Sequence, residues 1–332
     1  MPSTRLGLLL AAYAAAAALG ACADPDAPAR PDAWGEASEL PGRRLEPAVA
    51  AAGARLVVAG GFSTSAREGL EITREVVALD TLAGTWIQLP DLPVAWTHAA
   101  LAASAGTLYL LGGLEGAAFT PRGEAFALDP GADAWRDLPP LPPGLERGAA
   151  AVVTSPPHVY LIGGAAAGTA ALASVLDYNL ATGEWTQLPD LPSPRSHAAA
   201  MRRADGTLIV AGGLAHETGA PLDEVYALPL GADAWEPRSP MPTGRGGCAY
   251  GVALGQLVCA GGEAGSSALR TALAYDPIAD TWTPLPDAPE PRAGVTGAVI
   301  GQQLYIPGGA SALVYEPLSS VLVFSLLDAL PR

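Results

Sequence analysis

Short apolar runs bounded by glycine and proline recur along this chain. In one example, Thr107–Leu111 runs into a glycine pair, and Glu124–Asp129 follows before a Pro130-Gly131 turn. Apolar runs of this length between turn residues are typical of β-strands. This stretch carries no 3.6-residue period of an amphipathic helix over a useful length. The pattern predicts an all-β protein.

Two residue patterns repeat at nearly fixed intervals. Six glycine pairs lie 52, 51, 49, 49 and 47 residues apart, and six tryptophans run in phase with them. The pairs are Gly60-Gly61, Gly112-Gly113, Gly163-Gly164, Gly212-Gly213, Gly261-Gly262 and Gly308-Gly309, and the tryptophans are Trp34, Trp86, Trp135, Trp185, Trp235 and Trp282. A fixed period near 50 residues predicts a repeat architecture.

The glycine pair, an apolar strand and a Trp…Leu-Pro segment recur together and in the same order. With these motifs the chain resembles a kelch-repeat β-propeller over roughly residues 32–330. The resemblance implies a six-bladed propeller of four-stranded antiparallel blades, with strands a to d running outward from a central channel. It implies that the glycine pair ends strand b, that the tryptophan lies in strand d, and that both pack blade against blade.

The two ends of the repeat region leave two ways of closing the ring. Trp34 lies 26 residues before Gly60, so its segment is a strand d with no strand c before it. We expect this strand to complete the last blade and leave no open edge. In the alternative, residues 312–317 align with residues 272–277, which they resemble, so that the C-terminus supplies its own strand d and the Trp34 segment is left over.

The N-terminal residues are expected to lie outside the propeller, which takes residues 32–332. An apolar run from Leu6 to Leu19 leads into Leu19-Gly20-Ala21-Cys22, which resembles a bacterial lipobox. The resemblance implies a signal peptide over residues 1–21, lipidation of Cys22 and a Pro/Ala/Asp tether over residues 22–31. Secretion with ordinary cleavage at alanine is the alternative. The expected localisation is the bacterial cell envelope, periplasmic or on the outer membrane or cell surface, with the lipid as the only membrane contact.

Composition excludes several classes of partner and chemistry. All 18 basic residues are arginine, which excludes Schiff-base and P-loop lysine chemistry. The net charge of −15 argues against nucleic acid and against an anionic membrane surface as partners. No motif implies a cofactor, so none is expected.

Two cysteines, Cys248 and Cys259, remain after Cys22. With the hairpin turn at Gly255-Gln256, Cys259 faces Val252 rather than Cys248. This register predicts two buried thiols, with a disulfide as the alternative.

Sequence motifs of common catalysts are absent: the chain has no Gly-x-Ser-x-Gly, His-Glu-x-x-His or Cys-x-x-Cys. His98 and His197 occupy equivalent positions in strand a of blades two and four, where they can face each other across the channel. Because a metal site needs three or four ligands, no metal site is expected.

The starts of the innermost strands give the candidate ligand-binding residues. Arginines recur there and are expected to converge on one mouth of the channel, where guanidinium groups suit carboxylate recognition. Trp96 offers a stacking face, while Glu46, the counterpart of His197 in blade one, offers an acid-base group. The candidate set is Arg44, Trp96, His98, Arg195, Arg245 and Arg292, with Arg147 matching only in a shifted register. The alternative is that these arginines pair with acids of neighbouring blades and hold the ring together.

Two function classes remain. The first is an envelope-anchored kelch module that binds a protein or a carbohydrate at one propeller face. The second is a sugar-acid mutarotase or epimerase of the exported kelch type, with a sialic-acid-like substrate and with Glu46 and His197 as catalytic groups. The enzyme requires Arg195, Arg245 and Arg292 to cluster in one water-accessible pocket, and a binding module does not. The binding module is favoured because Gly247 and Gly294 stand where the histidines stand in other blades.

Overall fold

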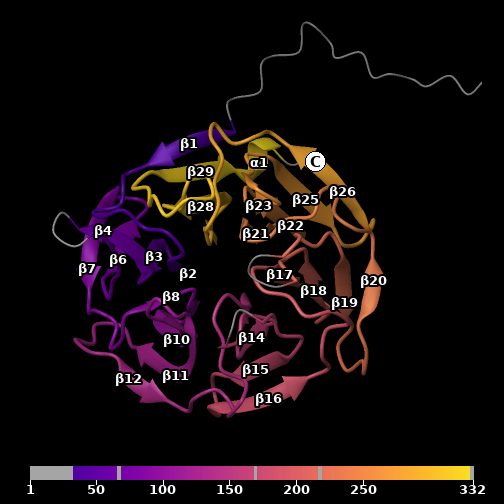
Figure 1. Cartoon of the computed structure of the whole chain (residues 1–332), viewed down its shortest axis with the longest axis horizontal. Coiled ribbons are helices and arrows are strands. Elements are labelled where there is room, and N and C mark those ends of the chain that lie inside the picture. Colours follow the sequence, from indigo (N-terminus) through magenta and orange to yellow (C-terminus); the bar gives the residue numbers. More distant parts are fainter. Residues whose placement is uncertain (1–32, 66–68, 168–169, 216–218, 330–332) are drawn as a thin grey trace, which may run out of the picture. The chain divides into compact units, whose positions relative to one another are not determined.

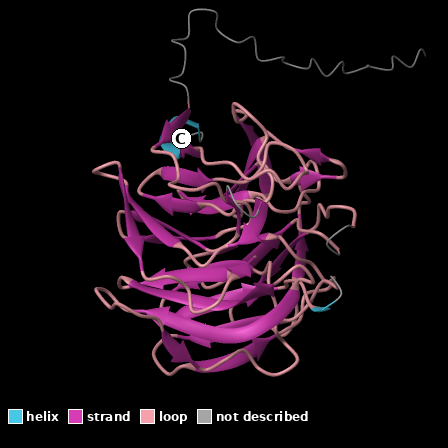
Figure 2. Ribbon diagram, turned by 60° about the vertical axis from the view of Figure 1, so that its left-hand side comes forward, coloured by secondary structure: helices cyan, strands magenta, loops and turns pink. Residues whose placement is uncertain are grey.

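Six four-stranded antiparallel sheets form a closed ring of blades around a central channel (Figures 1 and 2). The computed structural model describes residues 33–65, 69–167, 170–215 and 219–329. The expected signal peptide over residues 1–21, Cys22 and the tether over residues 22–31 therefore lie outside the described residues. The kelch-type fold expected from the repeats is confirmed.

Each blade runs outward from an innermost strand that lines the channel. Blade one consists of β2 (Ala48–Ala52), β3 (Arg55–Ala59), β6 (Val76–Asp80) and β7 (Thr85–Leu89), and blade two of β9 (Ala100–Ser104), β10 (Thr107–Glu115), β11 (Thr120–Leu128) and β12 (Arg136–Leu138). Blade three consists of β13 (Ala151–Ser155), β14 (His158–Ile162), β15 (Val175–Asn179) and β16 (Glu184–Leu188), and blade four of β17 (Ala199–Arg202), β18 (Leu208–Ala211), β19 (Val225–Leu228) and β20 (Glu236–Arg238). Blade five consists of β21 (Ala249–Ala253), β22 (Gln256–Ala260), β25 (Ala272–Asp276) and β26 (Thr281–Leu285), and blade six of β27 (Ala298–Ile300), β28 (Gln303–Pro307), β29 (Val321–Ser325) and β1 (Trp34–Ala37).

The remaining elements are short. β4 (Phe62–Ser65) pairs with β5 (Gly69–Ile72), β23 (Glu263–Ala264) pairs with β24 (Ser267–Ala268), and β8 (Trp96–Thr97) pairs with the end of β10. The helix α1 (Leu326–Ala329) is a single turn. Within the described ranges, no helix has the length and hydropathy needed to cross a bilayer.

The N-terminal strand closes the ring. β1 pairs antiparallel with β29, with Trp34 opposite Phe324, and their rings lie 4.4 Å apart. This pairing confirms the expected clasp (Figure 1). Residues 312–317, which the alternative aligned with a strand, lie in the loop before β29, and residues 312–316 are exposed. Val321–Phe324 form the strand instead because their side chains are buried in the packing of the last blade.

The glycine pairs bring neighbouring blades into contact. A Cβ added to the first glycine of each pair would meet a backbone carbonyl at the entrance to the next blade, as Gly163 meets Arg195 O at 2.2 Å. The second glycine commonly donates its N–H to that same carbonyl, as Gly164 does to Arg195 O at 2.9 Å. The contact from Gly308 to Arg44 O closes the ring. Glycine is needed here because a side chain would clash with that carbonyl, and because a left-handed φ is unfavourable for any other residue.

The six tryptophans make a second set of contacts between blades. Each indole Nε1 donates to a carbonyl oxygen in the segment that follows the outermost strand of the preceding blade, at 2.8–3.1 Å. The acceptors, in the order Trp34, Trp86, Trp135, Trp185, Trp235 and Trp282, are Pro286, Ser38, Pro90, Pro139, Pro189 and Ser239. The expected role of both motifs in blade-to-blade packing is confirmed.

Cys248 and Cys259 form a disulfide, with their Cα atoms 5.9 Å apart, so the prediction of two free thiols is wrong. The error lies in the turn. Ala253 pairs with Gln256, which places the turn at Leu254-Gly255, one residue earlier than expected. In an antiparallel hairpin this shift moves every partner by two residues, so Cys259 faces Tyr250 and comes within reach of Cys248.

We expect the disulfide to stabilise the hairpin of blade five measurably. Its two cysteines are 11 residues apart in sequence, and closing a loop of that size removes chain entropy equivalent to about 2–3 kcal/mol. The double variant Cys248→Ala, Cys259→Ala should therefore unfold in urea with a free energy lower by that amount. Addition of a reductant should lower the stability of the wild type toward that of the variant and leave the variant unchanged.

Candidate functional site

The propeller has two unlike faces. Tight turns join the first two strands of a blade and the last two strands, and antiparallel connectivity puts these turns at one end, which we call the hairpin face. The long loops within blades and the segments between blades reach the other end, which we call the loop face. A cavity of about 310 Å³ occupies the channel, and a second of about 240 Å³ opens toward the loop face. Glu46, His98 and His197 line both cavities, so they stand where the two meet.

A collar of six equivalent residues surrounds the channel at this level. Its members are Glu46, His98, Ala149, His197, Gly247 and Gly294, and all have a left-handed φ between 51° and 61°. The backbone N–H of each of five members donates to the carbonyl of the member in the preceding blade, at 2.8–3.2 Å. The equivalence of Glu46 with His197 expected from the repeat alignment matches this geometry. The bonds fix the backbone from which the collar side chains project.

Three collar side chains come together. One ligating atom from each of Glu46, His98 and His197 lies within 4.8 Å of the others. His98 Nε2 is 3.7 Å from Glu46 Oε2, and the two imidazole rings meet edge to face at 5.2 Å. The expected approach of the two histidines across the channel is seen, and Glu46 adds a third group to it.

Burial governs the charge of these imidazoles. It lowers the pKa of His197 to about 4, and burial together with the neighbouring His197 lowers the pKa of His98 well below its usual value. Both imidazoles are therefore neutral near pH 7. His98 Nδ1 lies 3.0 Å from Thr97 Oγ1, and His197 Nδ1 lies 3.0 Å from Ser196 Oγ, so a hydroxyl of the preceding residue orients each ring.

The recurring arginines do not converge on the channel mouth, and this part of the expected site is corrected. Their side chains are 0–2% exposed and turn into their own blades. Arg195 donates to Gly212 O, Glu224 O and the Glu224 carboxylate, and Arg245 donates to Gly261 O and Thr271 O. Long side chains at a strand entrance can reach inward or along the blade, and here unpaired carbonyls within the blade attract them.

The other arginines behave alike. Arg44 bonds Ser63 and Glu75, and Arg292 bonds Glu290 and Ser320. Arg147 donates to Gly163 O and Ser174 O without any shift of register, since Gly148 bridges Ala165 as Ser196 bridges Leu214. All these partners lie in the same blade as the arginine rather than in a neighbouring blade. In the five blades that carry one, the arginine therefore fastens the innermost strand to the strands outside it.

Trp96 likewise departs from its expected role as a stacking face in the channel. It is 1% exposed and packs against Phe126, with ring centroids 5.8 Å apart. A Cβ at Gly113 would touch its ring at 3.0 Å. Trp96 occupies in blade two the position that arginine occupies in the other five blades.

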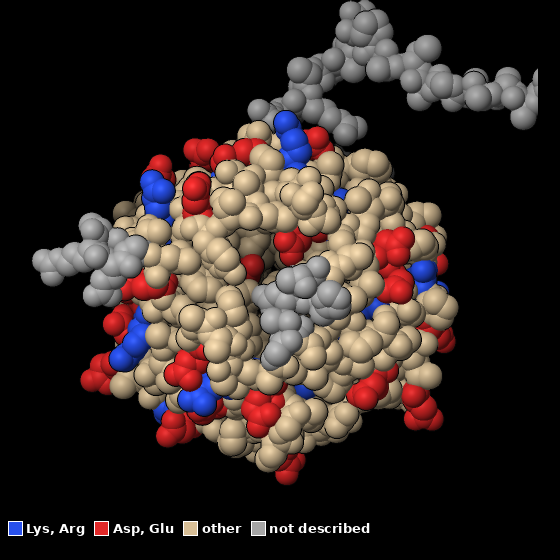
Figure 3. Space-filling model, in the orientation of Figure 1, with Lys and Arg blue, Asp and Glu red and all other residues tan. Residues whose placement is uncertain are grey.

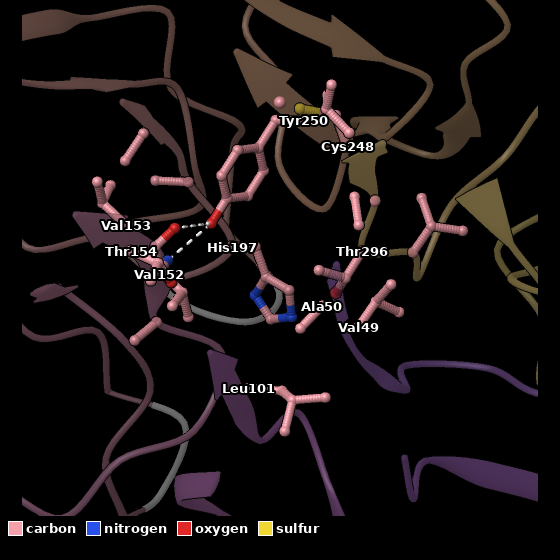
Figure 4. A pocket seen from close by; sticks show the side chains of 18 of the residues that line it. Val49, Ala50, Leu101, Val152, Val153, Thr154, His197, Cys248, Tyr250 and Thr296 are labelled. Atoms are coloured by element: carbon pink, nitrogen blue, oxygen red, sulfur yellow. Dashed lines mark hydrogen bonds between the residues drawn. The ribbon is translucent and has the colours of Figure 1, made fainter. Parts of the chain in front are cut away.

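Tyr250 is a channel residue that sequence reasoning missed. It projects from β21 of blade five to β13 of blade three, where the Val152 N–H donates to its hydroxyl at 2.7 Å and the hydroxyl donates to Val152 O at 3.1 Å (Figure 4). Burial raises the pKa of Tyr250 to about 12. Tyr250 braces two innermost strands across the cavity that His197 also lines. Alignment of the blades could have revealed Tyr250, because no other blade has an aromatic residue at this position. The equivalent residues are Val49, Leu101, Val152, Ala200 and Gly297.

An apolar segment beside the loop-face cavity was also missed. The segment lies in the loop between β28 and β29 and borders that cavity. It consists of Leu313, Val314 and Tyr315, whose side chains are 38%, 47% and 59% exposed. Tyr315 packs edge-on against Phe62, with ring centroids 5.5 Å apart. Because this segment resembles residues 272–277, the sequence suggested a strand here, whereas the segment is an exposed loop.

The channel mouth is acidic. Among the residues that the structure describes, those bordering the loop-face cavity include Glu46 and Glu263 and no arginine. Viewed down the channel, acidic side chains appear within the central opening, and the visible basic side chains lie farther out (Figure 3). A neutral or cationic group is therefore favoured at this mouth over an anion.

Known proteins resemble this chain in sequence. Residues 97–309 match the KLHDC2/KLHL20/DRC7 Kelch-repeats domain. Kelch-like protein terF of Aspergillus terreus is 34% identical over 283 residues, which make up 80% of this chain and 61% of terF. Human Kelch-like protein 34 is 30% identical over 255 residues, which make up 72% of this chain and 38% of that protein.

The chain therefore spans less than two thirds of the length of these two relatives. The family match covers well over half of the chain and falls on the repeats themselves. The order of glycine pairs, tryptophans and four-stranded blades agrees with that match. The chain belongs to the kelch-repeat family, whose propellers typically serve as protein-interaction modules.

Proposed function

We propose that this protein is a docking module that binds a partner protein at the channel mouth of its loop face. The observation that carries the proposal is the exposed segment Leu313-Val314-Tyr315 beside a cavity of about 240 Å³. Exposed apolar side chains next to a concave opening are typical of protein interaction sites. Loops on a rigid scaffold are also where binding residues concentrate.

The chemistry of the mouth suggests the chemistry of the partner. Tyr315 at its edge belongs to an aromatic cluster, since Phe62, which is buried at the start of β4, packs against both Tyr315 and Phe119. Glu46 and Glu263 add negative charge to the cavity. A partner segment that combines an apolar side chain with a basic one fits this surface best, because each would meet its complement.

Affinity purification of the full chain from its native host tests this proposal. We expect at least one protein to co-purify with the wild type and to be lost from the Leu313→Ser, Val314→Ser variant. The matched control is Leu230→Ser, Ile278→Ser, which removes two apolar side chains that are 72% and 85% exposed on the hairpin face. Loss of the partner from the control variant, or equal recovery from all three proteins, would contradict the proposal.

The alternative is a sugar-acid mutarotase or epimerase that takes a carbohydrate instead of a protein. Glu46 and His197 do share a cavity, as that activity requires. The guanidinium groups meant to hold the substrate carboxylate are buried in the blades, and the carboxylates of Glu46 and Glu263 in the loop-face cavity repel an anion. These observations favour the docking module.

We also propose that the module is exported and anchored to the bacterial cell envelope through Cys22. The support is the lipobox-like Leu19-Gly20-Ala21-Cys22 after an apolar run. The Cys22→Ser variant should lose incorporation of a labelled fatty acid and move from the membrane fraction to the soluble fraction. Equal labelling of Cys22→Ser and wild type, or no labelling of either, would overturn the anchor.

A further inference from the structure

We propose that Glu46, His98 and His197 bind one divalent transition-metal ion at the centre of the collar. Each residue offers one ligating atom, and these atoms lie within 4.8 Å of one another. Two imidazole nitrogens and a carboxylate oxygen are a donor set that Zn²⁺ and related ions accept. The site lies where the two cavities meet, so an ion can reach it from the loop face. This inference does not depend on the docking proposal.

The backbone supports these ligands. His98 N–H donates to Glu46 O at 3.2 Å, and Ala149 continues the hydrogen-bonded chain from His98 to His197. All three ligands have a left-handed φ, of 51°, 54° and 55°, which is unfavourable for residues other than glycine. Blades five and six have glycine at this position, and blade three has Ala149. Retaining strained ligand side chains where glycine suffices is typical of a functional site.

The hydrogen bonds also orient the imidazoles for a metal. Thr97 Oγ1 donates its single proton to Glu46 O at 3.2 Å. The hydroxyl oxygen therefore accepts a hydrogen bond from His98, and His98 Nδ1 carries the proton. The lone pair of His98 is then on Nε2, the atom 3.7 Å from Glu46 Oε2. Ser196 Oγ lies 3.0 Å from His197 Nδ1, and accepting a proton there would leave the lone pair of His197 on Nε2 as well. A ligating histidine whose second nitrogen is bonded to a protein oxygen is the usual arrangement at metal sites.

The distances fit an ion with small side-chain movements. With metal–ligand bonds of about 2.0–2.1 Å, two ligands of a tetrahedral ion lie roughly 3.3 Å apart. The pair of His98 Nε2 and Glu46 Oε2 is already close to that separation. Three protein ligands leave at least one coordination position, which faces the cavities and can take water or a donor group from a docked partner.

Cobalt binding to the full chain tests the site. The Cys22→Ser background is used because it carries neither the proposed lipid anchor nor the thiol of an unmodified Cys22, while Cys248 and Cys259 are joined in a disulfide. Titration with Co²⁺, followed by visible absorption and by displacement with Zn²⁺, should show one ion per chain. Each ligand is replaced in turn by glycine, the residue that blades five and six already carry in the collar, so the backbone conformation is kept. The variants are His98→Gly, His197→Gly and Glu46→Gly. Each should weaken binding by more than the roughly 10–100-fold expected for loss of an outer hydrogen-bond partner.

Two further variants sharpen the result. His158→Gln changes a histidine that pairs with Asp177 at 2.9 Å outside the collar, and it should bind Co²⁺ as the parent does. Thr97→Val should weaken binding about 10–100-fold, because only the orienting hydroxyl is lost. If a glycine variant unfolds in EDTA, Glu46→Gln repeats the test at nearly constant shape. Absence of stoichiometric binding to the parent, or binding that persists in all the collar variants, would overturn the proposal.

Discussion

Gly163→Ala should abolish folding or destabilise the protein by at least about 4 kcal/mol, the range reserved for severe core defects. The new Cβ would lie 2.2 Å from the carbonyl oxygen of Arg195, at the entrance to the next blade. That carbonyl cannot yield, because it accepts the N–H of Gly164 at 2.9 Å. The φ of +64° at Gly163 adds strain for any side chain. Urea unfolding followed by tryptophan fluorescence measures the loss.

Gly231→Ala is the matched control. Gly231 also has a left-handed φ, of 77°, but an added Cβ meets nothing within 4 Å. The expected cost is therefore only the backbone term of about 1–2 kcal/mol. Equal destabilisation by the two substitutions would mean that φ alone, and not contact between blades, explains the glycine pairs.

Arg195→Met should lower the free energy of unfolding by about 3–5 kcal/mol, because several acceptors lose their donor at once and each unsatisfied buried one costs about 1–3 kcal/mol. The guanidinium is 0% exposed and donates to Gly212 O, Glu224 O and Ser193 Oγ. Methionine fills the space but leaves these acceptors without their donor. The effect should appear in the urea midpoint of the ligand-free protein.

Arg136→Met provides the comparison. Arg136 pairs with Asp129 at 2.8 Å, but its side chain is 51% exposed, so the expected loss is at most about 1 kcal/mol. If Arg195→Met were as stable as the wild type, a structural role for the recurring arginines would be wrong. Loss of sugar-acid binding in that stable variant would restore the carboxylate-binding interpretation.

The fold follows from the sequence to a large degree because the repeat constrains it many times over. The glycine pairs and tryptophans recur in each blade, so an error at one position does not alter the architecture. The clasp by Trp34 could be read from its distance to Gly60 alone. The disulfide could not be read from the sequence, because an uncertainty of one residue in the turn before Gln256 shifts the pairing partner of Cys259 by two residues.

The site was predictable only in part. Repeat alignment placed Glu46, His98 and His197 at equivalent positions, but their mutual distance depends on the diameter of the channel, which the sequence does not state. The direction of Arg195 was equally hidden, since an arginine at the start of an inner strand can reach the channel or the blade. Tyr250 shows the opposite case, an aromatic among small aliphatic equivalents that alignment of the blades reveals.

The most direct test of a functional loop face is site-specific photo-crosslinking in the native host. A photoreactive phenylalanine is placed at Tyr315 on the loop face and, in a second protein, at Leu254 in a tight turn of the hairpin face. These side chains are similarly exposed, at 59% and 57%. We predict a discrete adduct with a partner protein from position 315 and none from position 254. An adduct from position 254 with none from position 315 would contradict the account and assign docking to the hairpin face.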